Sequence, residues 1–270
     1  MKRKYMYFIF TDLDGTLYDK SFIPSDKNKL AIKKAQEKGI EVVIATGNPF
    51  SEKIKNIALD LNINYVVTSN GAYIHDMKND KALFKNHFSK KQIEVFKKTI
   101  HDYPVEVIYV TQEAFYSYNA SKERAEYVNK FNGFGKIHYE KDKIENSLKI
   151  EYFTKPEDSS AICNILKEND FECAKIKDIH LEITPKNSSK GSALKFLVMD
   201  HFKQENLDKV MAIGDSANDS SMFELVKFSY AMDNSNQNIK NQAKFFTSSV
   251  SQHGVAEAIY DFMFRNDLDK

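Results

Sequence analysis

The stretch that decides the fold is Phe8-Ile9-Phe10-Thr11-Asp12-Leu13-Asp14-Gly15-Thr16-Leu17. Its beginning belongs to an apolar run over Tyr5–Thr11 that is rich in aromatic residues and predicts a strand. Two carboxylates, Asp12 and Asp14, follow directly; Gly15 permits a sharp exit and Thr16 offers a hydroxyl. Because sites in open α/β sheets form at the carboxyl ends of the strands, this stretch predicts a polar site at a sheet edge.

Strand and helix patterns alternate on both sides of a middle section. Ser25 and Gly39 bracket a predicted helix over Asp26–Lys38, and Ile40–Ala45 is an almost continuously apolar run. Such runs suit strands that are buried on both faces of a parallel sheet. The same alternation returns after Asn187, with a predicted helix, strand and helix over Gly191–Phe202, Val210–Ile213 and Ala217–Val226.

The middle section has a different pattern. Predicted strands over Val105–Val110 and Ala114–Tyr118 read as an antiparallel pair, and further strands and three helices follow among them. This is typical of a separate α+β unit. The sequence therefore predicts an α/β core domain formed by residues 1–81 and 187–270, interrupted by an inserted α+β domain over residues 82–186.

Three further motifs also lie where predicted strands end or helices begin. They are Thr46-Gly47-Asn48, Lys190 in Ser189-Lys190-Gly191, and Gly214-Asp215-Ser216-Ala217-Asn218-Asp219. If these ends are neighbours, the carboxylates crowd together and require a cation, for which Mg²⁺ with oxygen ligands is suited. Lys190 and the backbone amides of Thr46 and Gly47 would then bind phosphate oxygens, and a carboxylate could act as the nucleophile.

Taken in order, these motifs resemble those of the haloacid dehalogenase-like hydrolase superfamily. Shorter stretches resemble its Cof-type branch with a large cap (type IIB): Thr68-Ser69-Asn70-Gly71-Ala72, Leu181-Glu182-Ile183-Thr184-Pro185, Ser189-Lys190-Gly191 and Ala231-Met232-Asp233-Asn234. The resemblance implies a Rossmann-like parallel-sheet core with a cap inserted between the second and third motifs. It also implies a Mg²⁺-dependent phosphatase that acts on small phosphorylated metabolites, such as sugar phosphates or phosphorylated cofactors, through an aspartyl-phosphate.

Residue roles follow from the resemblance by position. Asp12 would be the nucleophile and Asp14 the general acid. Mg²⁺ would be held by Asp12, the Asp14 carbonyl and Asp215, while the phosphate would be bound by Thr46, Gly47, Lys190 and Asn218. Asp219, Asn48 and Thr16 would have supporting roles; Asn48 departs from the family pattern, which has arginine there, and this bears on substrate preference.

Two other functions stay open on the sequence. A phosphomutase or phosphotransferase would use the same aspartyl-phosphate but pass it to another hydroxyl. A non-catalytic phosphoacceptor or binding protein would not need Asp14, so Asp14→Asn separates it from an enzyme.

Composition limits the classes of partner. The 270 residues carry 39 basic and 38 acidic side chains, and this near-neutral charge argues against nucleic acid as a partner. Met1-Lys2-Arg3-Lys4 is basic, but the apolar stretch after it is too short for a signal peptide or a membrane span. We therefore expect a cytoplasmic protein, a monomer or weak homo-oligomer, in which Cys163 and Cys173 are separate thiols.

Overall fold

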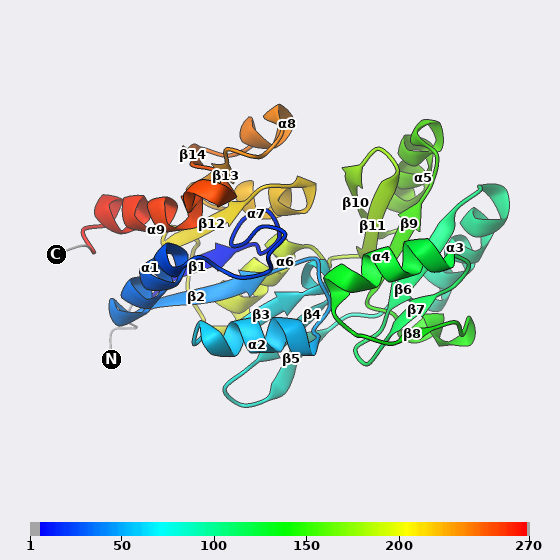
Figure 1. Cartoon of the computed structure of the whole chain (residues 1–270), viewed down its shortest axis with the longest axis horizontal. Helices are drawn as coiled ribbons and strands as arrows, with labels where there is room; N and C mark the ends of the chain where they lie inside the picture. Colours follow the sequence, from blue (N-terminus) through cyan, green and yellow to red (C-terminus); the bar gives the residue numbers. More distant parts are fainter. Residues whose placement is uncertain (1–5, 269–270) are drawn as a thin grey trace.

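The computed structural model describes residues 6–268, which form two lobes that are each built on one β-sheet (Figure 1). The N-terminal and C-terminal parts of the chain share one lobe, and the middle of the chain forms the other. The basic residues Met1–Lys4, and Tyr5 at the start of the expected first strand, lie outside the described residues.

The first lobe contains an eight-stranded sheet. Its spatial order is β14 (Phe245–Thr247), β13 (Phe228–Met232), β12 (Val210–Gly214), β1 (Tyr7–Thr11), β2 (Ile40–Ala45), β3 (Tyr65–Thr68), β4 (Tyr73–Asp76), β5 (Lys81–Lys85). Pairing is parallel from β14 to β3 and antiparallel from β3 to β5. The predicted α/β class with a parallel-sheet core is confirmed.

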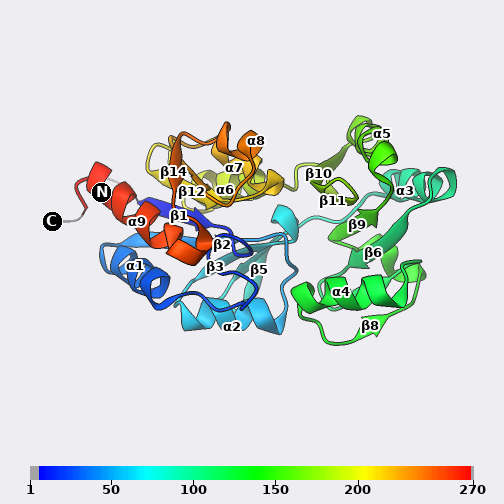
Figure 2. The same cartoon turned by 45° about the horizontal axis from the view of Figure 1, so that its top comes forward.

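Side-chain alternation along the strands explains why helices cover both faces of this sheet. On β1, Ile9 packs into one hydrophobic cluster, while Phe8 and Phe10 pack into another on the opposite face. The Ile9 side carries α1 (Asp26–Glu37), α2 (Glu52–Asp60) and α9 (Gly254–Arg265). The Phe8 side carries α6 (Lys190–Lys195) with its π-helical extension Phe196–His201, α7 (Ser220–Phe223) and α8 (Gln237–Lys240). Figure 2 shows the two groups on opposite sides of the sheet.

The second lobe, here called the cap, contains a six-stranded sheet. Its order is β10 (Phe171–Lys177), β11 (His180–Pro185), β9 (Lys149–Phe153), β6 (Glu106–Val110), β7 (Phe115–Ser117), β8 (Ile137–His138). One face packs against α3 (Lys90–Asp102) and α5 (Pro156–Glu168), and part of the other face packs against α4 (Lys122–Asn132). Short 3₁₀ turns complete the described structure: η1 (Ser69–Gly71), η2 (Asp142–Asn146), η4 (Ala217–Asp219) and η5 (Val250–Gln252).

The chain first passes from the core lobe to the cap a few residues after residue 82, the expected start of the insertion. Residues 82–85 belong to β5, which pairs with β4 in the first sheet. Lys81 and Lys85 make β5 a polar edge strand, so it lacks the apolar signal of the buried strands. The side chain of Asn86 binds both the Lys186 carbonyl and the Ser188 hydroxyl at 2.8 Å, which ties the two connections together. We propose that the cap begins at Asn86 rather than at residue 82.

Two further expectations need correction. Cys163 on α5 and Cys173 on β10 are joined as a disulfide, with Cα atoms 5.8 Å apart, and are not separate thiols. A sequence separation of 10 gave no sign of this, because α5 folds back along β10. The helix expected over Ala217–Val226 is a 3₁₀ turn followed by the four-residue α7. Among residues 6–268, no helix has both the length and the apolar character to cross a membrane.

Candidate active site

The sequence-predicted residues meet at the carboxyl edge of the core sheet. Asp12 follows β1, Thr46 follows β2, Asp215 follows β12, and Lys190 is the first residue of α6. These ends are adjacent because β1 lies between β2 and β12 in the sheet. A cavity of about 730 Å³ opens here, with the core residues on one side and one face of the cap sheet on the other.

Lys190 joins two buried carboxylates. Its Nζ lies 2.7 Å from Asp12 Oδ1 and 2.7 Å from Asp219 Oδ1, and its side chain is fully buried. Burial acts to lower the pKa of Lys190, but the two carboxylates outweigh it and raise that pKa above its ordinary value, so the ammonium stays charged. Both carboxylate oxygens of Asp219 are engaged within the protein, because its Oδ2 also accepts from the backbone N–H groups of Asp215 and Ser216 at 3.0 Å each.

Asp215 completes an acidic group that suits a cation. Carboxylate oxygens of Asp12, Asp215 and Asp219 lie within 4.8 Å of one another. Burial, together with the charges of Asp12 and Asp219, raises the pKa of Asp215 to about 8. Thr16 donates to Asp215 Oδ1 at 3.3 Å. Since both oxygens of Asp219 are already engaged, Asp12 and Asp215 are the carboxylates of this group with capacity left for a metal ion.

Gly15 is required by this close approach. Its φ is +81°, and a Cβ placed on it would lie 2.5 Å from Asp215 Oδ2. A side chain at residue 15 would therefore push into the acidic group as well as strain the backbone.

Asp14 lies beside the acidic group with its own partners. The Asn48 amide donates to Asp14 Oδ2 at 2.5 Å, and the Tyr18 hydroxyl is 3.5 Å from the same oxygen. Burial raises the pKa of Asp14 despite the opposing effect of the nearby Lys53. A carboxyl group with a raised pKa is suited to hold and release a proton. Asn48, at the position where the family pattern has arginine, thus contacts the Asp14 side chain.

The remaining predicted residues form a second part of the site around Gly47. The Asn48 N–H donates to Thr46 Oγ1 at 3.1 Å, which holds this loop in a tight turn. A Cβ on Gly47 would lie 3.0 Å from Asn70 Oδ1 and 3.2 Å from Asn218 Nδ2. Asn218 Nδ2 donates to Asn70 Oδ1 at 3.0 Å. The structure therefore brings Thr46, Gly47 and Asn218 together.

The cap residues that line the same cavity were not foreseen as site residues. They include Lys149, Glu151, His180 and Glu182. Two of them carried a signal: the stretch Leu148–Phe153 places charges at alternate positions of an otherwise apolar strand. Charged side chains are rarely buried unless they are paired, so this alternation indicates a polar face that is covered by another part of the protein.

Comparison with known proteins agrees with this geometry. A family model described as haloacid dehalogenase-like hydrolase matches residues 9–259. Phosphatase YwpJ of Bacillus subtilis is 30% identical, with 93% of this chain and 98% of that protein covered. From the same organism, 5-amino-6-(5-phospho-D-ribitylamino)uracil phosphatase YwtE is also 30% identical, with 93% and 96% covered.

Solved structures have the same fold. A haloacid dehalogenase-like hydrolase from B. subtilis superposes with a TM-score of 0.83 at 25% identity, with 94% of this chain and 99% of that chain covered. The HAD subclass IIB sugar phosphatase BT4131 superposes with a TM-score of 0.83 at 20% identity, covering 97% of this chain and all of the other. Since the family model spans most of the chain, the protein belongs to the haloacid dehalogenase-like hydrolase family and is a phosphatase.

Proposed function

We propose that this phosphatase hydrolyses monophosphate esters of small metabolites through a phosphoryl group carried on Asp12, with Mg²⁺ as its cofactor. The observation that carries the proposal is the buried pairing of Asp12 with Lys190 at the end of β1, beside Asp215 and Asp14. A carboxylate held by a charged lysine has one oxygen fixed and leaves the other oxygen for attack on phosphorus.

The residues present fit a hard cation. Asp12 and Asp215 would hold Mg²⁺ together with the backbone carbonyl of Asp14. Burial raises the pKa of both side chains, and neighbouring carboxylates add to that rise. When bound, the ion neutralises charge on the phosphoryl oxygens.

The chemistry then divides between two aspartates. Asp12 forms an O–P bond while the bond between phosphorus and the leaving oxygen breaks, and Asp14 gives its proton to that oxygen. In the second half, Asp14 takes a proton from water, whose oxygen attacks phosphorus and releases phosphate from Asp12. Asn48 positions Asp14 for both steps, while Lys190, Asn218 and the Thr46–Gly47 backbone bind the other phosphoryl oxygens.

The cavity supports a small substrate. Its volume of about 730 Å³ accommodates a phosphate and a leaving group of metabolite size. The substrates that two similar proteins are named for, a ribitylamino uracil phosphate and sugar phosphates, agree with this size class.

The test is phosphate release from p-nitrophenyl phosphate and a panel of sugar and cofactor monophosphates, with Mg²⁺ or with EDTA. We expect Asp12→Asn to lower kcat by at least about 10³-fold. Asp200→Asn, at an exposed position on the π-helical extension of α6, is the matched control and should act as wild type. Release that survives in Asp12→Asn, or in EDTA, would contradict the proposal. Appearance of a transferred phosphate ester instead of inorganic phosphate would favour a phosphomutase.

A further inference from the structure

The C-terminal end of the cap helix α4 lies against the core, beside the loop that follows Asp14. Phe131 on α4 packs edge to face against Phe22 of that loop, with ring centroids 5.8 Å apart. Lys53 on α2 donates to the Phe131 carbonyl at 3.1 Å, and its ammonium lies 3.7 Å from the centroid of the Phe22 ring. One core lysine therefore contacts the cap and the core loop at the same time.

The backbone on both sides is adapted to this close approach. α4 ends at Gly133, whose φ is +75°, and a Cβ placed there would lie 3.0 Å from Lys53 Cβ. Phe22 has a φ of +59°, which a bulky residue rarely adopts unless surrounding contacts hold it. The Phe131 carbonyl is among the last four of α4, which lack partners within the helix and carry the negative end of its dipole, so an ammonium is a suitable partner.

Lys53 also faces the catalytic site. Its ammonium lies 5.6 Å from the centroid of the Tyr18 ring, and the Tyr18 hydroxyl is 3.5 Å from Asp14 Oδ2. Tyr18 is almost fully buried, so its ring has little room to move away. Burial lowers the pKa of Lys53, and the attraction of the Asp14 carboxylate opposes that fall, so the two charges act on each other.

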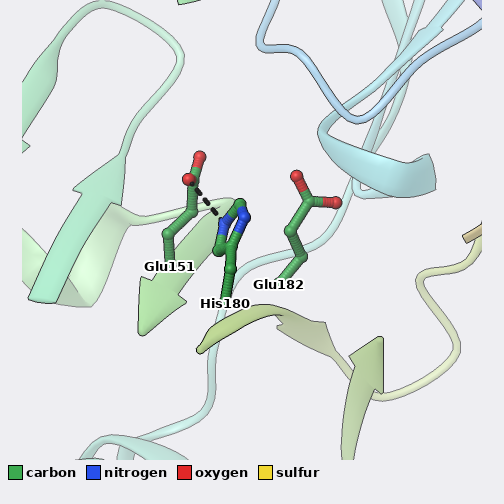
Figure 3. A group of neighbouring side chains, drawn as sticks. All are labelled: Glu151, His180 and Glu182. Atoms are coloured by element: carbon green, nitrogen blue, oxygen red, sulfur yellow. Dashed lines mark hydrogen bonds and ion pairs between the residues drawn. The ribbon is translucent and has the colours of Figure 1, made fainter. Parts of the chain in front are cut away.

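The cap sheet meets the core at a different place. His180 and Glu151 bond to each other within the cap, as the dashed line in Figure 3 marks. Glu182 reaches the core, but it accepts from Asn70 and Asn218 at the phosphate end of the cavity. Of these two contacts, the end of α4 is the one beside the general acid.

We propose that Lys53 is a positioning residue for the general acid: the docked end of α4 holds its ammonium facing Asp14, where it stabilises the carboxylate that Asp14 becomes on giving its proton to the leaving oxygen. This inference rests on the proposed function. A fixed charge aimed at the place where opposite charge develops lowers the barrier without reorganisation during the reaction. Since the Phe131 carbonyl and the Phe22 ring hold the ammonium, its effect depends on the docked cap.

A matched pair of aryl esters tests this role. Phenyl phosphate and p-nitrophenyl phosphate have the same ring, but phenolate is the stronger base and depends more on a proton from Asp14. The quantity to compare is kcat/KM, because it covers the steps from free enzyme and substrate to departure of the leaving group. We expect Lys53→Met to lower kcat/KM about tenfold with phenyl phosphate, the scale of one charge removed about 6 Å away at an effective dielectric constant of about 40. The loss with p-nitrophenyl phosphate should be less than about twofold.

Two controls separate positioning from packing. Lys53→Arg keeps the positive charge and should recover most of the activity on phenyl phosphate. Lys33→Met makes the same change at an exposed position on α1 and should alter neither substrate. Loss of packing alone would lower both esters alike and leave their ratio unchanged.

Two glycines after α4 test the dependence on the cap. Gly133→Ala brings a Cβ to 3.0 Å from Lys53 Cβ and should reproduce the selective loss of Lys53→Met. Gly135→Ala is the matched control, because Gly135 has a similar φ of +73° but nothing within 4 Å of a Cβ, so the ratio should stay as in wild type. In a Lys53→Met background, Gly133→Ala should lower the ratio no further, because both changes remove the same interaction.

The outcomes separate the two proposals. Equal losses with both esters in Lys53→Met, or no loss with either, overturn the role of Lys53 and leave the phosphatase chemistry standing. A ratio in Gly133→Ala that matches wild type overturns the dependence on the cap. A wild type that cleaves p-nitrophenyl phosphate but not phenyl phosphate also overturns the role of Lys53, since no acid then assists the leaving group. Failure to cleave any ester, p-nitrophenyl phosphate included, overturns the proposed function itself.

Discussion

Replacing Lys190 with methionine tests the electrostatic core of the site. The substitution keeps the length and most of the volume of the side chain, but it removes the ammonium that lies 2.7 Å from both Asp12 and Asp219. Both carboxylates are buried, so neither regains a full hydration shell when its partner is lost. The expected results are a less stable protein and an inactive one.

The size of the stability loss follows from the burial. Breaking a buried ion pair by removing one partner costs about 3–5 kcal/mol. The pKa of Asp219 is about 6 with Lys190 present, since burial raises it more than Lys190 lowers it. Without Lys190 that pKa rises further, so Asp219 takes up a proton at neutral pH and limits the loss to about 3 kcal/mol. For a domain of this size, that corresponds to a fall in Tm of about 6–12 °C.

Thermal unfolding followed by circular dichroism at neutral pH measures this fall. Lys195→Met is the matched control, because Lys195 is exposed on the same helix, and its Tm should be unchanged. The double variant Lys190→Met/Asp219→Asn puts a neutral amide in place of the carboxyl group that would otherwise have to take up a proton, and it should recover part of the loss. Phosphatase activity should fall by about 10²–10³-fold in Lys190→Met, since one preorganised charge at the phosphoryl group is removed.

The reasoning is refuted if Lys190→Met unfolds within about 2 °C of Lys195→Met, which would be less than about 1 kcal/mol. It is equally refuted if the double variant is less stable than Lys190→Met alone. Either result would mean that the carboxylates are solvated or uncharged in the native protein.

Two further predictions concern the metal group and the cap. Gly15→Ala should bind Mg²⁺ more weakly in calorimetric titration, because the new Cβ would lie 2.5 Å from Asp215 Oδ2. Gly39→Ala is the control: Gly39 has a similar φ of +77° but nothing within 4 Å of a Cβ, so this variant should keep its Mg²⁺ affinity and lose only about 1–2 kcal/mol of stability. The lowered pKa of Glu151 means that its ion pair with Lys149 stabilises the fold above the ordinary value of 4.5, and that this contribution is lost as the pH falls below it. Urea unfolding should therefore separate wild type from Glu151→Gln by about 1–3 kcal/mol at neutral pH, with a difference that shrinks on acidification; a constant difference would contradict this.

Local patterns in the sequence were sufficient to predict many of the strands of this protein and the positions of its main site residues. The apolar residues of Tyr7–Thr11 predict a strand that is buried on both faces of a sheet. Asp12 and Asp14 come directly after it, which predicts a polar site where this strand ends. Such features depend on neighbours along the chain, so periodicity and turn chemistry predict them. The order of the motifs along the chain is likewise a property of the sequence, and it is sufficient to indicate the family.

Other features exist only because distant segments meet. Lys190 lies 178 positions from Asp12, and Glu182 of the cap lies 112 positions from Asn70 of the core. The strand order that brings β1 between β2 and β12, and the fold of the cap that turns Glu151 and Glu182 toward the cavity, are set by the packing of whole elements. The sequence alone determined which residues could do the chemistry. Tertiary structure decided which of them form ion pairs with one another and which face of the cap lines the cavity, because those contacts join residues that are far apart in the sequence.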